Sequence, residues 1–377
     1  MHLYSLLASQ RWCTKIRKHY LPPPQRTIST GGIRRSRTAL LFPGQGAQYV
    51  GMGKDIYDAF PNSARLVIDE ADDELEGSLK KLMFEGEQDE LTLTRNAQPA
   101  ILTTSLAILK VLECEYGFDV GKSCKYALGH SLGEYTALVA TKSLSLRDAV
   151  RLVRLRGEAM QKTVEQLANP VSMSALIVRG KQIAEIEREI EAARKELPEG
   201  EVAELANVNS TFQVVISGTS RGVDILSQIL HQRQFGARAV DLPVSAPFHC
   251  SLMKPAADAM EYALRSVRFS LPVVEVISNV DAMPYTHATD IAGNLFQQIT
   301  RTVQWQHSIE YCKQNGINEF VAFGPGRVLS NLVKKQYPLD RVHSVATVAD
   351  IEAQAKDFQK IIDEEEDGVE LKENGKL

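Results

Sequence analysis

The pentapeptide Gly129-His130-Ser131-Leu132-Gly133 constrains the fold of this 377-residue chain more than any other stretch. The apolar "CKYAL" precedes it and "GEYTALVAT" follows it, which predicts a strand, a sharp turn and a helix. Small residues let the backbone turn tightly there, so that the serine hydroxyl is exposed and the next N–H is free to bind an oxyanion. The pattern therefore favours Ser131 as a nucleophile; the alternative is an ordinary serine in a packed helix N-terminus.

Composition places the chain among globular proteins with a sizeable core, because 44% of its residues are hydrophobic. It contains no uncharged apolar run of about 18 residues, so we expect no membrane span. Its five cysteines are odd in number and include no Cys-x-x-Cys pair. This spacing argues against a disulfide framework or a zinc site and favours a reducing compartment.

The first 37 residues carry eight Lys or Arg and no acidic residue, and Asp55 is the first acid in the chain. A basic, acid-free leader with alternating apolar residues is typical of a mitochondrial transit peptide, so we predict one at 1–37 and a matrix location. The alternative is a basic arm that binds nucleic acid or a membrane. Without the leader, 35 basic residues face 47 acidic ones, a formal charge near −12 that excludes non-specific nucleic-acid binding.

The pattern along the rest of the chain predicts an α/β fold. A buried strand at 38–42 leads into the glycine-rich "GQGAQYVGMG", and buried helices are expected at 97–112 and 145–168. The glycine-rich loop fits neither nucleotide-binding motif, since Tyr49 replaces the last glycine of the dinucleotide pattern and Lys54 has no glycine six residues before it.

Between residues 171 and 244 the elements become short and follow the order β-α-β-β-α-β, which predicts an inserted ferredoxin-like subdomain. The larger subdomain then comprises 38–170 and 245–350, with a parallel sheet similar to that of α/β-hydrolases. Residues 351–377 are rich in acids and are expected to form a tail.

A nucleophilic serine needs a base, most often a histidine. Outside the leader the candidates are His130, His231, His249, His287, His307 and His343. Spacing separates them only weakly. His249 follows a strand and Pro247, where a loop could present it to the serine, and a buried structural histidine is the alternative.

Arg156 is expected to point inward from the helix at 145–168, because it lies three residues after Val153 and four before Met160 on the apolar side. A guanidinium keeps its proton and is costly to bury alone, so it requires a carboxylate. That carboxylate belongs either to an internal Asp or Glu or to a substrate acid held by two hydrogen bonds.

Seven stretches in order resemble the malonyl-CoA:acyl-carrier-protein transacylases, in particular their mitochondrial form, over residues 38 to 335. They are "FPGQGAQYVGMG", "GHSLGEYTALVA", "RLVRLRGEAMQ", "NVNSTFQVVISG", "PVSAPFHCSLMKPAA", "VQWQHSIEY" and "FGPGRVLSNL". Taken residue by residue, the resemblance implies that Ser131 is the nucleophile, His249 its base and Arg156 the clamp for the malonyl carboxylate.

The resemblance also implies supporting residues. Backbone N–H groups of Gln45 and Leu132 would bind the oxyanion, and the main-chain carbonyl of Gln304 would orient the histidine. Phe248 resembles the bulky residue that leaves little space for an α-methyl group on the acyl chain.

The implied activity is transfer of a malonyl group from malonyl-CoA to the phosphopantetheine thiol of acyl carrier protein, by way of a malonyl-serine, in mitochondrial fatty-acid synthesis. The enzyme would need no metal and no cofactor of its own and would act as a monomer. A serine thioesterase or esterase with a similar turn is the nearest alternative, and a silent scaffold that binds acylated carrier is another. The carrier is acidic, so docking would need a basic patch, for which Lys254, Lys334 and Lys335 are candidates.

Overall fold

The computed structural model describes residues 37–178, 182–235, 238–242, 244 and 246–359. The predicted transit peptide lies outside the described residues except for Arg37. The described helices outside the second sheet include α2 (Lys54–Ala59), α3 (Ala64–Glu74), α4 (Leu79–Glu85), α5 (Gln88–Thr92), α6 (Thr94–Glu115), α7 (Val120–Ser123), α8 (Gly133–Ala140), α9 (Leu146–Glu165), α12 (Lys254–Ser266), α13 (Ala288–Gln298), α14 (Trp305–Gln314) and α15 (Val328–Gln336).

The first sheet is parallel throughout, as the sequence predicts, with the strand order β7-β2-β1-β8-β9. Its strands are β1 (Thr38–Phe42), β2 (Tyr126–Gly129), β7 (Glu275–Ile277), β8 (Glu319–Phe323) and β9 (Arg341–Val345). Successive side chains of a strand point to opposite faces. Accordingly Leu40 and Phe42 pack into the main core cluster, whereas Ala39 and Leu41 pack into a second cluster on the other face.

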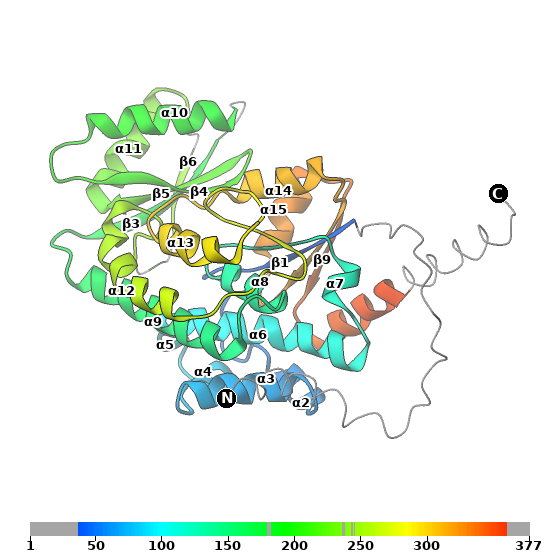
Figure 1. The fold of residues 1–377 in the computed structure, drawn as a ribbon. Helices are drawn as coiled ribbons and strands as arrows, with labels where there is room; N and C mark the ends of the chain where they lie inside the picture. The colour runs from blue at the N-terminus through cyan, green and yellow to red at the C-terminus, as the bar shows by residue number, and fades with distance from the viewer. Residues whose placement is uncertain (1–36, 179–181, 236–237, 243, 245, 360–377) are drawn as a thin grey trace, which may run out of the picture. The chain divides into compact units, whose positions relative to one another are not determined.

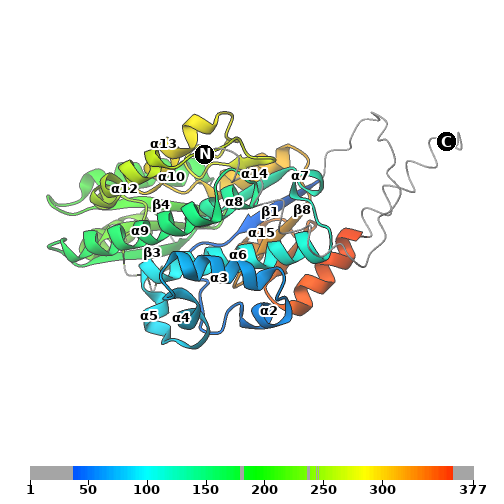
Figure 2. The same cartoon turned by 60° about the horizontal axis from the view of Figure 1, so that its bottom comes forward.

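Helices cover both faces of this sheet. The helices α6, α8 and α9 pack against one another and contribute to the main core, and Figure 2 shows them running alongside each other. The opposite face is covered by α14 and α15 through Trp305 and Val333. Helix α6 is long and apolar enough to cross a membrane, but 83% of its apolar window is buried within the protein, as expected of a core helix.

The second sheet is antiparallel, with the order β4-β5-β3-β6. Its elements follow one another as β3 (Val171–Ile177), α10 (Ile183–Ala193), β4 (Ala203–Ser210), β5 (Gln213–Thr219), α11 (Ser220–Gln232) and β6 (Arg238–Asp241). This chain order and strand order are those of a ferredoxin-like unit, so the predicted fold class is confirmed. Figure 1 shows α10 and α11 on one face of the sheet.

The two faces of the second sheet belong to different cores. Leu176, Ile216 and Val208 pack with α10 and α11 in a separate cluster, whereas Met173 and Val215 on the other face join the main core. The small unit therefore packs directly against the larger one, and its strands β4 and β5 can position groups in the larger unit.

The first residues of the predicted acidic tail, 351–359, belong to the folded core. Residues 348–359 are helical, and Ile351 and Phe358 are buried in the main core. The ring of Phe358 stacks on Phe118 at 4.4 Å between centroids. The prediction of a tail rested on the acidic residues beyond 359 and overlooked the apolar spacing of this last helix. Those acidic residues lie outside the described residues.

Candidate active site

The turn around Ser131 has the geometry that its two glycines predict. Strand β2 ends at Gly129, helix α8 begins at Gly133, and Ser131 between them has a φ of 53°, in the left-handed region. A Cβ atom on Gly133 would lie 2.2 Å from the carbonyl oxygen of Phe42, and one on Gly129 would lie 1.8 Å from the backbone of Gly133. Neither contact is possible, so both positions require glycine.

Two side chains that sequence reasoning missed hold the backbone of Ser131 in this conformation. Asn279 accepts a hydrogen bond from the Ser131 N–H at 2.7 Å and donates to the Gly129 carbonyl at 2.6 Å. The Gln298 side chain donates to the Ser131 carbonyl at 2.9 Å. A signal for Asn279 was available, because it lies two residues after the end of β7 and the carboxyl ends of neighbouring parallel strands meet at one edge of a sheet.

His249 lies against the serine, 118 positions away in the chain. Its Nε2 is 2.8 Å from Ser131 Oγ, and its Nδ1 is 2.7 Å from the main-chain oxygen of Gln298. A carbonyl can only accept, so Nδ1 carries the proton and Nε2 is free to accept from the hydroxyl. Burial, and then the positive charge of Arg156, lower the pKa of His249 to about 3. The imidazole is therefore neutral and able to act as a base.

The prediction that the Gln304 carbonyl orients the histidine is wrong. The carbonyl at Nδ1 belongs to Gln298, whereas Gln304 directly precedes α14 and its carbonyl accepts from the N–H and the hydroxyl of Ser308. The difference follows from where each residue lies in its helix. Gln298 is the last residue of α13, where carbonyls have no N–H partner in a following turn. Gln304 directly precedes α14, so its carbonyl accepts from the first turn of that helix.

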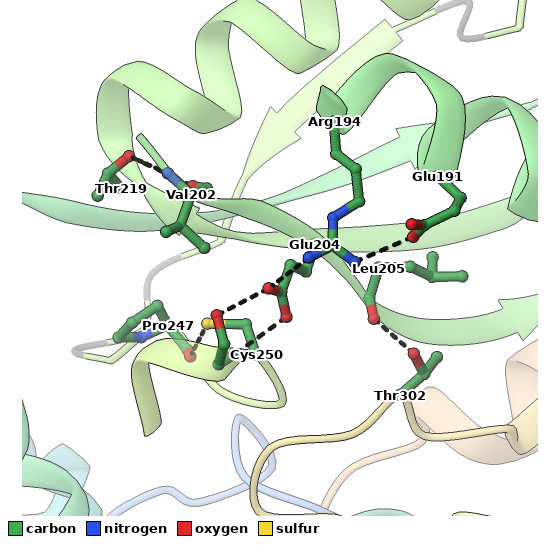
Figure 3. Close-up of polar contacts among 10 residues, drawn as sticks. Glu191, Arg194, Val202, Glu204, Leu205, Thr219, Pro247, Cys250 and Thr302 are labelled. Atoms are coloured by element: carbon green, nitrogen blue, oxygen red, sulfur yellow. Dashed lines mark hydrogen bonds and ion pairs between the residues drawn. The ribbon is translucent and has the colours of Figure 1, made fainter. Parts of the chain in front are cut away.

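The loop that carries His249 is held by the second sheet. The hydroxyl of Ser217 on β5 donates to the Phe248 carbonyl at 2.7 Å. Glu204 on β4 accepts from the N–H and the hydroxyl of Ser251 at 2.9 and 2.7 Å, and it also pairs with Arg194 at 2.9 Å. Figure 3 shows Glu204 between Arg194 and the loop at Cys250. We call the contact between Glu204 and Ser251 the Glu204 latch.

Strand β4 also holds the segment that follows α13. The carbonyl of Leu205 accepts from the Thr302 hydroxyl at 2.7 Å, which Figure 3 also shows, and Ala206 and Val303 share a backbone hydrogen bond. Strand β4 thus holds both the loop that carries His249 and the segment that follows Gln298, whose carbonyl contacts His249.

Arg156 points inward, as predicted, and is 2% exposed. Its guanidinium donates to Gln98 Oε1 at 2.9 Å, to Gln298 Oε1 at 2.9 Å and to Ser131 Oγ at 3.1 Å. All three partners are neutral, and the Nε has no partner among the described residues. In the described part of the chain no internal carboxylate contacts Arg156 directly, so its cation lies next to the serine hydroxyl without an ion pair there.

The two predicted oxyanion donors flank the turn. Among the described residues neither the Gln45 N–H nor the Leu132 N–H donates a hydrogen bond, so both are free for a ligand. Gly44, before Gln45, approaches the elbow so closely that a Cβ there would lie 2.7 Å from the His130 carbonyl. Their role in binding an oxyanion stays a prediction.

Phe248 is 8% exposed, and its ring centroid lies 6.5 Å from that of His249. It therefore lies near the base, where it could restrict the acyl chain, and this selecting role also stays a prediction. His130 points away from the serine, because its Nε2 lies 3.0 Å from Asn209 Oδ1 on β4. The described residues contain no cluster of metal-ligating side chains.

This arrangement combines a nucleophile, a neutral base, free backbone donors and a buried cation, which is what acyl transfer to and from an acidic acyl group requires. Comparisons with known proteins point the same way. A family model described as "Acyl transferase domain" matches residues 39–367. A malonyl CoA-acyl carrier protein transacylase of Bacillus subtilis (strain 168) is 44% identical over 301 residues, which cover 80% of this chain and 90% of that protein.

Solved structures are also similar. The acyl-carrier-protein-S-malonyltransferase from Bartonella henselae superposes with a TM-score of 0.78 at 40% identity, over 85% of this chain and 99% of that one. A malonyl-transacylase in complex with its type II PKS acyl-carrier protein gives a TM-score of 0.77 at 34% identity, over 85% of this chain and all of that one, 100%.

Proposed function

The chain belongs to the acyl transferase family as a malonyl-CoA:acyl carrier protein transacylase, and we propose that it works through a malonyl ester of Ser131. The observation that carries this proposal is the placement of three groups around one hydroxyl. Ser131 Oγ lies 2.8 Å from the His249 base and 3.1 Å from the Arg156 guanidinium.

In the first half-reaction His249 Nε2 takes the Ser131 proton while Oγ attacks the thioester carbon of malonyl-CoA. The oxyanion of the tetrahedral intermediate accepts from the N–H groups of Gln45 and Leu132, each contributing about 2.7–4 kcal/mol to the transition state. The C–S bond then breaks, and the CoA sulfur leaves as a thiol with the proton from His249.

The second half-reaction reverses these steps with a different thiol. His249 takes the proton of the carrier's phosphopantetheine thiol, the sulfur attacks the malonyl ester, and the C–O bond breaks as Ser131 regains its proton. Thioester is exchanged for thioester, so no energy source is needed. The enzyme needs no cofactor of its own, because the partner carries the phosphopantetheine.

The Arg156 guanidinium selects the acyl group. A single methylene separates the two carboxyl carbons of malonate, so a cation beside the nucleophile is within reach of the free carboxylate. Donors on a planar guanidinium suit a carboxylate, which accepts two of them in parallel. An acetyl group would leave this buried charge unpaired, and that cost discriminates against acetyl-CoA.

We also propose that the protein acts in mitochondrial fatty-acid synthesis, as a monomer in the matrix. The support is the leader of 37 residues with eight basic and no acidic side chains. Residues 1–37 fused to a reporter should direct it to the matrix and be removed there. A reporter that stays in the cytosol would contradict this location.

Transfer is separated from hydrolysis by following CoA release. The protein mixed with malonyl-CoA should release about one CoA per Ser131 in a burst and then turn over slowly, because water is a poor acceptor. Adding the carrier with its phosphopantetheine should restore rapid turnover and produce malonyl carrier. Rapid turnover without any carrier would instead identify a thioesterase.

A further inference from the structure

Gln298 contacts all three of the main active-site residues. Its carbonyl faces His249 Nδ1, its amide oxygen accepts from Arg156 Nη2, and its amide nitrogen donates to the Ser131 carbonyl. The side chain is fully buried. One residue thus contacts the base through its main-chain carbonyl, and the cation and the nucleophile through its side-chain amide.

A side-chain amide has nearly the same shape when its oxygen and nitrogen exchange places, so its hydrogen-bond partners decide which orientation it takes. The second acceptor of the Gln298 amide nitrogen is Oε2 of Glu134, at 2.7 Å. Reversing the amide would direct its oxygen at this carboxylate and at the Ser131 carbonyl, and its nitrogen at the guanidinium. A hydrogen bond to a charged partner is about twice as strong as a neutral one, so the Glu134 carboxylate and the Arg156 guanidinium, on opposite sides of the amide, both oppose this reversal.

Glu134 is itself fixed from the opposite side. The Tyr285 hydroxyl donates to its Oε1 at 2.5 Å, and the Asn279 N–H donates to its Oε2 at 3.3 Å. Only 1% of Glu134 is exposed, and burial raises the pKa of its carboxyl to about 7. A carboxyl so costly to bury, and not used in the proposed chemistry, calls for another role.

Electrostatics point in the same direction. The Gln298 amide lies between the Arg156 cation and the Glu134 carboxyl, with its oxygen on the cation and its nitrogen on the carboxyl. In its ionised form the Glu134 carboxyl offsets part of the cost of burying Arg156 without occupying the guanidinium, which stays available to a substrate carboxylate.

Resting on the function proposed above, we propose that Glu134 is a positioning residue that orients the Gln298 side-chain amide and through it Arg156 and the backbone of Ser131. Three single variants test this role. Glu134→Met has a similar volume, but its thioether is only a weak hydrogen-bond acceptor. Glu134→Gln keeps an acceptor for Gln298, because its amide can donate to a reversed Tyr285 hydroxyl. Tyr285→Phe is the matched control, since it disturbs the same pocket but leaves the bond to Gln298.

The readouts are the single-turnover rate of Ser131 malonylation, the malonyl-to-acetyl ratio of that rate and the Tm. We expect Glu134→Met to lower the rate roughly 10- to 100-fold and to lower the ratio as well. Glu134→Gln should recover the rate to within about threefold, and Tyr285→Phe should lower the Tm with a similarly small effect on the rate. If Glu134→Met does not fold, Glu134→Met with Tyr285→Phe replaces it, because that pair leaves no unpaired hydroxyl.

A purely structural role predicts that the rates of all variants follow their Tm values, and that result would overturn the inference alone. Failure of the wild-type protein to take a malonyl label at Ser131 would instead overturn the proposed function, and the role of Glu134 with it.

Discussion

Ser131 and His249 approach to 2.8 Å, and both have left-handed backbone conformations, with φ of 53° and 61°. Such conformations are strained for residues with side chains and persist only where the surroundings fix them. Asn279 and Gln298 fix the serine, and the Glu204 latch together with Ser217 fixes the loop of the histidine. The catalytic contact therefore depends on both sheets.

The Glu204 latch gives a first prediction. Glu204→Ala frees the N–H and the hydroxyl of Ser251, so His249 should lose its alignment with Ser131. We expect the rate of Ser131 malonylation to fall about 10-fold or more, since small misplacements of reacting groups are costly. The malonyl-to-acetyl ratio should not change, because Arg156 lies elsewhere. Glu191→Ala is the control, since Glu191 pairs with the same Arg194 but belongs to α10; equal losses in both variants would contradict the latch.

Arg156 gives a second prediction. Arg156→Ala should lower the malonyl-to-acetyl ratio of the acylation rates by about 30-fold or more, because a hydrogen-bonded charge contributes on the order of 2 kcal/mol. Arg156→Lys should restore little of it, since an ammonium cannot form the two parallel hydrogen bonds. Arg151→Ala on the exposed side of the same helix should leave the ratio unchanged. The measurement is the acylation rate with malonyl-CoA and with acetyl-CoA by stopped flow. An unaltered ratio in Arg156→Ala would refute the role of Arg156 in binding the malonyl carboxylate.

The pKa of His249 gives a third prediction, for stability. Folding lowers this pKa from 6.5 to about 3, so below 6.5 the unfolded chain binds a proton that the folded protein does not. The contribution of His249 to stability is thus complete above pH 6.5 and is lost as the pH falls toward 3. From pH 7 to pH 5 the loss is about 2 kcal/mol.

Urea unfolding of the wild-type protein and of His249→Gln at both pH values measures this loss. The wild-type protein should lose about 2 kcal/mol more than the variant on going to pH 5. Equal losses would mean that the imidazole is not held neutral in the folded state.

Much of this site could be predicted from local sequence. Gly129 and Gly133 fix the turn at Ser131, because no larger residue fits at either position. The helical spacing alone predicts that Arg156 points inward, without knowledge of its partners. The resemblance to known transacylases identified His249, for which spacing alone was a weak guide.

What could not be predicted depends on contacts between distant segments. The resemblance placed the histidine's partner carbonyl at Gln304, but only the folded chain, in which the end of α13 meets His249, reveals that it belongs to Gln298. Glu134 is separated by 164 positions from the amide it contacts, and no local pattern encodes such a pair.

The most direct test of the account is the intact mass of the full chain after brief exposure to malonyl-CoA, followed by peptide mapping. The account predicts one malonyl group per chain, attached at Ser131, absent from Ser131→Ala and lost when carrier with its phosphopantetheine is added. An unlabelled protein, or a label on any other residue, would contradict it.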